Sequence, residues 1–272
     1  MSTEKIFLAQ RRSTPPASAA LIKTAKDFVR WILPLTQNRV QVIGFDTEYA
    51  VPTTVPLKGS GKDWQDFTDL RPIVLSLCAN IHVDGELRKH ACCVFVWKGG
   101  EDPQLIPTLG AFFRQPFVFA CHWQRAEYSA LDCLGLRRPQ YVYDTYLAER
   151  VLTLGLNNFG KDETSRGRPD EWDGTDDSND KGHDGGLKLL NLCTRYGITH
   201  GHSEGKQDLV LRFASWTDQN VLGQEEVRYA IEDARVCADI YPLQLREMID
   251  SGSIYPYISM YGPAASLLTE MS

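Results

Sequence analysis

The sequence predicts an α/β fold in which a mixed β-sheet is flanked by helices. Short runs rich in β-branched and aromatic residues occupy much of the stretch from residue 39 to residue 120, and helical periodicities dominate after it. Strands that precede helices in this way are typical of one mixed sheet with helices on its faces. At 272 residues, the chain is long enough for one main core with appended segments.

The N-terminal part precedes the predicted sheet. Apolar residues recur at helical spacing in SAALIKTAKDFVRWILPL, residues 18–35, so we expect one amphipathic helix that is stopped by Pro34. We therefore divide the chain into an N-terminal extension (1–39), a main domain (40–250) and a C-terminal tail (251–272).

The main domain contains four predicted strands and then four predicted helices. The strands are RVQVIGF (39–45), IVLSLCA (73–79), ACCVFVW (91–97) and FVFA (117–120). The helices span residues 122–135, 144–155, 186–197 and 225–250. Two segments interrupt this order: a loop from 50 to 72, and a stretch from 157 to 186 that is rich in Gly and Asp. The second has too few aliphatic residues to fold alone, and we expect a mobile surface insertion.

Composition excludes several classes of protein. No run approaches the ~18 apolar residues of a membrane span, and the polar N-terminus lacks a secretory signal, so we expect a soluble monomer in the cytoplasm or another reducing compartment. Seven cysteines without a CxxC pair indicate reduced core thiols. The net charge of −6 argues against a broad basic surface that coats nucleic acid.

Two pairs of residues carry chemistry. The first predicted strand ends in Asp46-Thr47-Glu48, and residues two apart in a strand point to the same face, so the carboxylates project together and favour a cation between them. Tyr229 and Asp233 lie four apart on the last predicted helix and share one face. Each pair also has an ordinary explanation: acids that begin a solvated loop, and a packed Tyr beside an exposed Asp.

Taken together, GFDTE and RYAIEDA resemble the first and third motifs of the DEDDy 3′–5′ exonucleases, which include the proofreading domains of family A DNA polymerases. Between them, YVYDTYLAERVL is similar to a segment of that family in which Asp144 caps a helix. GLKLLNLCTRYGI followed by Gly205-Lys206 also resembles the family, and the similarity extends from about Val40 to Arg246. The resemblance implies a ribonuclease H-like sheet, with antiparallel first strands and parallel later ones.

The second motif of the family departs from its usual form here. The family has an Asp on the helix that follows the FVFA-like strand, and the alignment of ACHWQRAEYSALDCLGL places Glu127 at that position. Glu is one methylene longer and binds metals equally well. Asp132 is the competing candidate, and we expect it on the helix surface. His122 then lies near the reacting end, although a lone His beside Trp123 is more often a packed structural residue.

The resemblance also implies a mechanism with two Mg²⁺ or Mn²⁺ ions held by Asp46, Glu48, Glu127 and Asp233, with Tyr229 positioning the attacking water. The expected reaction is hydrolysis of single-stranded DNA from its 3′ end, releasing nucleoside 5′-monophosphates. The resemblance to proofreading domains is compatible with an attached or associated DNA polymerase, and the sequence leaves that question open. Candidate nucleic-acid contacts, each of which is as readily an ordinary core or loop residue, are Thr47, Lys58, Lys62, Trp64, Phe67, His122, Trp123, Arg125 and Lys206.

Two other functions remain open. A Glu at the second motif is compatible with a DEDD-like module that binds nucleic acid and has lost efficient catalysis. An RNA-trimming enzyme similar to ribonuclease D is the other alternative, because the sequence does not identify residues that sense a 2′ hydroxyl.

Overall fold

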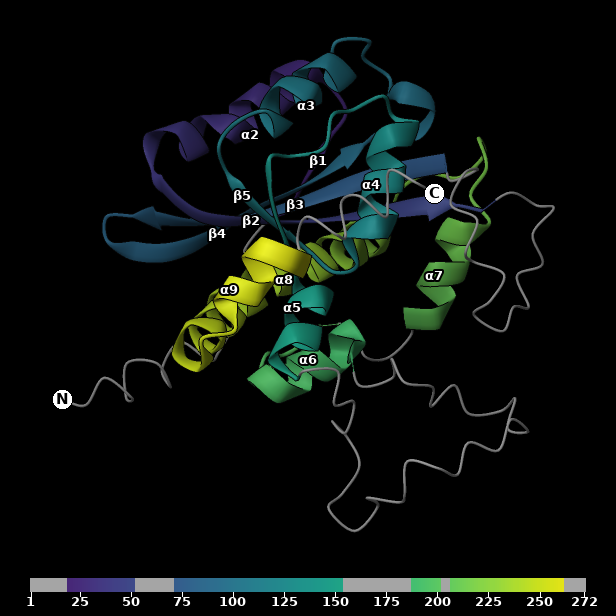
Figure 1. Cartoon of the computed structure of the whole chain (residues 1–272). Coiled ribbons are helices and arrows are strands. Elements are labelled where there is room, and N and C mark those ends of the chain that lie inside the picture. Colours follow the sequence, from purple (N-terminus) through teal and green to yellow (C-terminus); the bar gives the residue numbers. More distant parts are fainter. Residues whose placement is uncertain (1–18, 52–70, 154–186, 202–205, 262–272) are drawn as a thin grey trace, which may run out of the picture.

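The computed structural model describes residues 19–51, 71–153, 187–201 and 206–261. Its centre is a six-stranded sheet with the order β1-β4-β3-β2-β5-β6 (Figure 1). The strands are β1 (Ala19–Ile22), β2 (Arg39–Ala50), β3 (Arg71–Val83), β4 (Glu86–Phe95), β5 (Val118–Cys121) and β6 (Tyr141–Asp144). β2, β3 and β4 pair antiparallel, whereas the β1–β4, β2–β5 and β5–β6 pairs are parallel.

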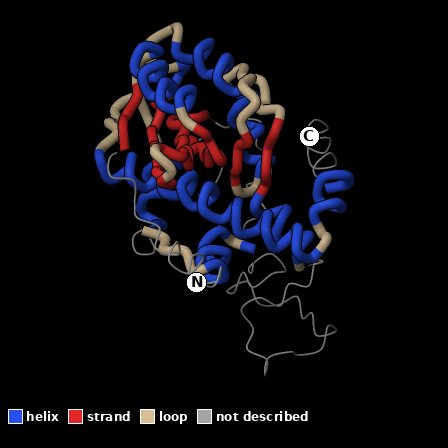
Figure 2. The backbone as a smooth tube through the Cα atoms, turned by 90° about the vertical axis from the view of Figure 1, so that its left-hand side faces the viewer, coloured by secondary structure: helices blue, strands red, loops and turns tan. Residues whose placement is uncertain are grey.

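Helices cover both faces of this sheet, as Figures 1 and 2 show. One layer contains α2 (Ala25–Gln37), α3 (Leu105–Phe113) and α4 (Gln124–Cys133). The other contains α5 (Thr145–Leu152), α6 (Leu189–Tyr196), α7 (Lys206–Ala214) and the long α8 (Gln224–Ser251). Three short helical turns, η3 (Trp97–Gly99), α9 (Ile254–Pro256) and η6 (Tyr257–Tyr261), complete the described part.

The alternation of side chains along β2 separates the two halves of the core. Ile43 and Phe45 pack with the layer of α2, α3 and α4, whereas Val42 packs with residues of α8. This is the period of two that a strand buried on both faces requires. It places Gly44 on the α8 face, two residues before Asp46.

The predicted N-terminal helix is wrong for its first residues. Ala19–Ile22 form β1, which pairs with β4, and the helix begins at Ala25 because the hydroxyl of Thr24 accepts a hydrogen bond from the backbone N–H of Asp27 (3.2 Å). A short apolar run does not distinguish strand from helix. Residues 19–37 therefore contribute to the sheet and to its helical cover.

Pro34 does not stop this helix, which continues to Gln37. The buried Leu35 keeps the last turn against the core, and the side-chain amide of Asn38 donates to the carbonyl of Pro34 (2.8 Å). Tertiary packing thus outweighs the cost of a proline near the end of a helix.

The four strands of the main domain are confirmed, each longer or displaced by a few residues, and so are its four helices. β6, α3 and α7 were not expected as separate elements. The prediction that Asp144 caps a helix is confirmed, since its carboxylate accepts from Tyr146 N and Leu147 N at the start of α5. The expected insertion at 157–186 and most of the 50–72 loop lie outside the described residues.

Tyr257, in the predicted tail, is buried, and its hydroxyl accepts a hydrogen bond from the backbone N–H of Asp144 (2.8 Å). All seven cysteines are reduced thiols, and six are buried as expected, with Cys133 exposed. Among the described helices, none combines the length and the apolar character that crossing a bilayer requires.

Candidate active site

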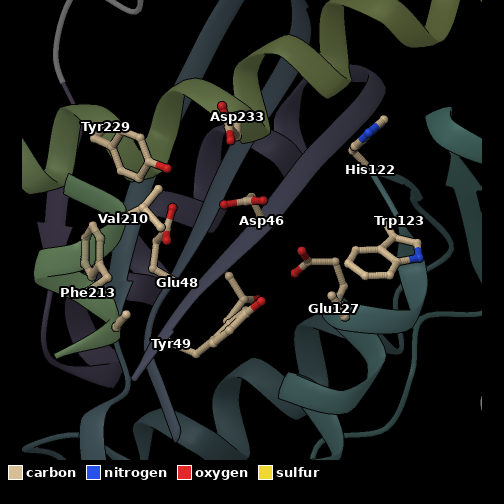
Figure 3. Close-up of a pocket in the computed structure, with 13 residues that line it drawn as sticks. Asp46, Glu48, Tyr49, His122, Trp123, Glu127, Val210, Phe213, Tyr229 and Asp233 are labelled. Atoms are coloured by element: carbon tan, nitrogen blue, oxygen red, sulfur yellow. The ribbon is translucent and has the colours of Figure 1, made fainter. Parts of the chain in front are cut away.

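A cleft of about 220 Å³ lies where the end of β2 meets α4, α7 and α8 (Figure 3). Its lining contains acidic, aromatic and small apolar side chains, namely Asp46, Thr47, Glu48, Tyr49, His122, Trp123, Ala126, Glu127, Val210, Phe213, Ala214, Tyr229 and Asp233. The structure therefore brings all five predicted catalytic residues into one cleft, although they come from three separate elements.

The close approach of β2 and α8 sets the position of the acids. A Cβ atom at Gly44 would lie 1.8 Å from the backbone oxygen of Ala234, so only glycine fits at this crossing. The crossing lies two residues before Asp46 on β2 and one residue after Asp233 on α8. The spacing of these two carboxylates is thus set by contact between backbones.

Tyr229 lies one helical turn before Asp233, and its hydroxyl points into the cleft (Figure 3). Its side chain is buried, and its ring stacks on Phe213 with the centroids 5.9 Å apart. Burial, followed by the negative charges of Glu48 and Asp233, raises the pKa of the phenol above its ordinary value. The group stays neutral and can both donate and accept a hydrogen bond.

Glu127 reaches the cleft from α4, in the opposite helical layer. Its side chain is only 4% exposed, and its Oε2 atom is buried without a hydrogen-bond partner among the described residues. Burial first, and then the charge of Asp46, raises the pKa of this carboxyl well above its usual range. The competing candidate Asp132 is exposed and pairs with Arg138 (2.6 Å), as expected for a surface residue.

A buried carboxylate holds the start of α4 in place. Trp123, just before α4, has the left-handed backbone conformation with φ +68°, which is uncommon for a bulky residue. Asp144 stabilises this turn because its two oxygens accept from Trp123 N (3.0 Å) and Gln124 N (2.9 Å). The same side chain also caps α5. Asp144 therefore fixes the helix that carries Glu127.

One polar contact of the acids was not expected from the sequence. His200, in the turn after α6, places Nε2 2.8 Å from Oδ1 of Asp233. Tyr49 and Phe213 also line the cleft without having been predicted. Tyr49 follows Glu48 directly along β2, whereas the contact of His200 depends on two segments that only the tertiary fold brings together.

Some of the predicted nucleic-acid contacts line the cleft, and others do not. Thr47, His122 and Trp123 line the cleft, and Trp123 is 44% exposed. His122 is also held structurally, since its Nδ1 lies 2.9 Å from Oγ1 of Thr145. Arg125 is half-buried on α4 and is not part of the cleft lining. Lys206 begins α7. Trp64, Phe67, Lys58 and Lys62 lie outside the described residues.

The donor set of the cleft suits a hard divalent cation. Four carboxylates face one another there, and the unpartnered Oε2 of Glu127 is a free acceptor directed into their midst. In the described part of the chain, no three His, Cys, Asp or Glu side chains are close enough together, as they stand, to enclose an ion. Asp46, Glu48, Glu127 and Asp233 fit such ions by chemistry, and binding requires their side chains to converge by rotation.

Comparisons with known proteins agree on the fold. No protein-family model and no curated protein sequence matches the chain. Escherichia coli RNase D, an exoribonuclease involved in structured RNA processing, is similar with 17% identity and a TM-score of 0.54 over 93% of this chain and 50% of that chain. The POL domain of Pol1 from M. smegmatis, in complex with DNA primer-template and dNTP, is similar with 16% identity and a TM-score of 0.52. That match covers 96% of this chain and 31% of the other.

The chain thus spans half of the first neighbour and about a third of the second. At these identities the likeness concerns the fold. It confirms the predicted ribonuclease H-like arrangement of a mixed sheet flanked by helices.

Proposed function

We propose that this chain is a metal-dependent 3′–5′ exonuclease that acts on single-stranded nucleic acid. The observation that carries the proposal is that Asp46, Glu48, Glu127 and Asp233 line one cleft together with the neutral phenol of Tyr229. An exonuclease-like fold alone leaves function open, because one fold hosts many activities. The 3′-to-5′ polarity comes from the resemblance of the sequence motifs.

The four carboxylates would hold two Mg²⁺ or Mn²⁺ ions, which supply activation of a water molecule and stabilisation of the leaving 3′ oxygen. Tyr229, fixed by its stacking on Phe213, accepts a hydrogen bond from that water and orients it toward the phosphorus. Glu48 accepts a hydrogen bond from the terminal 3′ hydroxyl, which restricts cleavage to a free end. Trp123, exposed beside Glu127, offers a face on which a base can stack.

The proposal is tested with Asp46→Ala on a 5′-labelled single-stranded oligonucleotide in Mg²⁺. We expect stepwise shortening by the wild type and a rate at least about 100-fold lower in the variant, because an essential charge-stabilising group is removed. Asp132→Ala is the matched control, since it removes an exposed Asp from the neighbouring helix. Equal laddering by Asp46→Ala and the wild type would contradict the proposal.

Two substrates are supported by different observations. The motifs resemble those of proofreading domains and favour DNA, whereas the structural likeness to RNase D favours RNA. DNA and RNA oligonucleotides of one sequence, compared by kcat/KM, decide between them. If the wild type binds both and shortens neither in Mg²⁺ or Mn²⁺, the chain is a binding module instead.

A further inference from the structure

His200 contacts Asp233 and lies outside the cleft lining. The imidazole Nε2 and Asp233 Oδ1 are 2.8 Å apart, and the His200 side chain is 2% exposed and is not part of the cleft lining. An ionised carboxylate only accepts hydrogen bonds, so Nε2 carries the proton and donates it. His200 is thus placed to act on Asp233 without touching a substrate in the cleft.

The backbone on both sides of His200 is fixed to α8. The carbonyl of Thr199 accepts from Nη2 of Arg235 (2.6 Å), and the N–H of Gly201 donates to Oε1 of Glu232 (2.6 Å). A Cβ atom at Gly201 would lie 3.3 Å from the same Glu232 oxygen, which shows how closely the turn approaches the helix.

Arg235 and Glu232 are themselves held rigidly. Arg235 is 2% exposed and donates twice to Glu232 (2.8 and 2.5 Å) and once to Asp239 (2.7 Å). Lys89 of β4 also pairs with Asp239 and connects the network to the sheet. Glu232 and Arg235, which flank Asp233 on α8, therefore fix the backbone around His200 so that its imidazole contacts the carboxylate of Asp233.

We propose that His200 is a positioning residue that holds the Asp233 carboxylate in the orientation required to bind a divalent cation. The inference rests on the proposed function, because it assumes that Asp233 is a metal ligand. Residues that donate a hydrogen bond to a metal-ligating carboxylate fix its orientation. Loss of such a residue commonly weakens metal binding by about 10–100-fold.

The test is titration of the full chain with Mn²⁺ alone, followed by calorimetry, for His200→Leu, His200→Asn and His200→Gln. The amide of Gln reaches the position of the imidazole Nε2, whereas that of Asn reaches only the position of Nδ1. We expect the Leu and Asn variants to bind Mn²⁺ about 10–100-fold more weakly, and the Gln variant to bind nearly as well as the wild type. Because Asn and Gln are both polar, their comparison remains informative even if the Leu variant misfolds.

His90→Leu is the matched control. His90 Nε2 lies 2.8 Å from the carbonyl of Trp31, so the substitution removes a similar imidazole hydrogen bond remote from the cleft and leaves Mn²⁺ affinity unchanged. The inference is overturned if all three His200 variants bind Mn²⁺ like the wild type while Asp233→Ala binds weakly. It is also overturned if His200→Gln loses as much affinity as His200→Leu. If Asp46→Ala and Asp233→Ala also bind like the wild type, the proposed metal site itself is wrong.

Discussion

Burial and the negative charge of neighbouring residues act on the carboxyl group of Glu127 in the cleft. Its carboxyl is buried with one oxygen unpartnered, and its pKa is raised by burial and then by Asp46. The folded protein therefore binds this proton more tightly than the unfolded chain does. The resulting stability is complete below the unfolded pKa of about 4.3 and declines as the pH rises above it.

Glu127→Gln removes the ionisable carboxyl group, and with it the free-energy cost of burying a carboxylate at neutral pH. At pH 7 we expect the free energy of unfolding to rise by roughly 1–3 kcal/mol, the range for relieving an unsatisfied buried group, while nuclease activity falls at least about 100-fold. Urea denaturation at pH 7 and pH 4 measures the difference, which should shrink at the lower pH. If the variant is less stable than the wild type at pH 7, interactions in the folded protein offset the cost of burying the Glu127 carboxylate, and the prediction is wrong.

Local geometry in the sequence predicts which side chains of the cleft share one face of a strand or helix. Asp46 and Glu48 follow from the period of two in a strand, and Tyr229 and Asp233 follow from the helical repeat. Glu127 required alignment with a motif. His200 could not be predicted, because its partner lies on another element and no local pattern relates the two.

At the scale of elements, the crossing of β2 and α8 is the most constrained contact. We expect Gly44→Ala to destabilise the protein by about 1–3 kcal/mol or more, because the new methyl group overlaps the carbonyl of Ala234 and displaces α8. Displacement of α8 also separates Asp46 from Asp233, so Mn²⁺ affinity should fall together with stability. Urea denaturation and Mn²⁺ titration measure the two effects.

Gly110→Ala is the control for this substitution. Gly110 lies inside α3, and a Cβ atom there would make only an ordinary contact with Leu136 at 3.5 Å. Alanine favours the helix by about 0.5–1 kcal/mol relative to glycine, so this variant should be as stable as the wild type or more so. An equally neutral result for Gly44→Ala would mean that β2 and α8 tolerate a wider separation.

Elements with long periodic patterns were predicted, and those that depend on their neighbours were not. β2, β3 and β4 are long and strongly patterned, whereas β1 and β6 have four residues each. β5 is equally short, but its apolar run FVFA predicted it. β1 is a strand because β4 offers it hydrogen-bond partners. The Thr24 cap was a local signal that could have placed the start of α2 at Ala25.

For the whole molecule, the net charge of −6 limits how nucleic acid is held. We expect few phosphate contacts by Lys or Arg. The logarithm of the association constant for an oligonucleotide should therefore fall with the logarithm of the salt concentration at a slope of about −2 or shallower, which corresponds to some three phosphates on a single strand. Fluorescence anisotropy with Glu127→Gln in Mg²⁺ measures binding without appreciable cleavage. A slope of about −4 or steeper would instead indicate an extended basic surface.

The fold class was predictable because its evidence is distributed along the whole chain. Strand patterns, helix patterns and their order all indicate one mixed sheet between helices, so a local error such as β1 does not change the result. The packing of the two helical layers, which brings Glu127 and Asp233 to opposite sides of one cleft, depends on long-range contacts that no segment encodes alone.

The contact between Gly44 and Ala234 also has a consequence during synthesis on the ribosome. The two residues lie near opposite ends of the described chain, and at the usual ~5–20 residues per second the second emerges about 10–40 s after the first. β2, β3 and β4 can pair during that interval, with Asp46 and Glu48 already in place within β2. Asp233 arrives only with α8, so a nascent chain that has formed most of its sheet still lacks a complete set of acids.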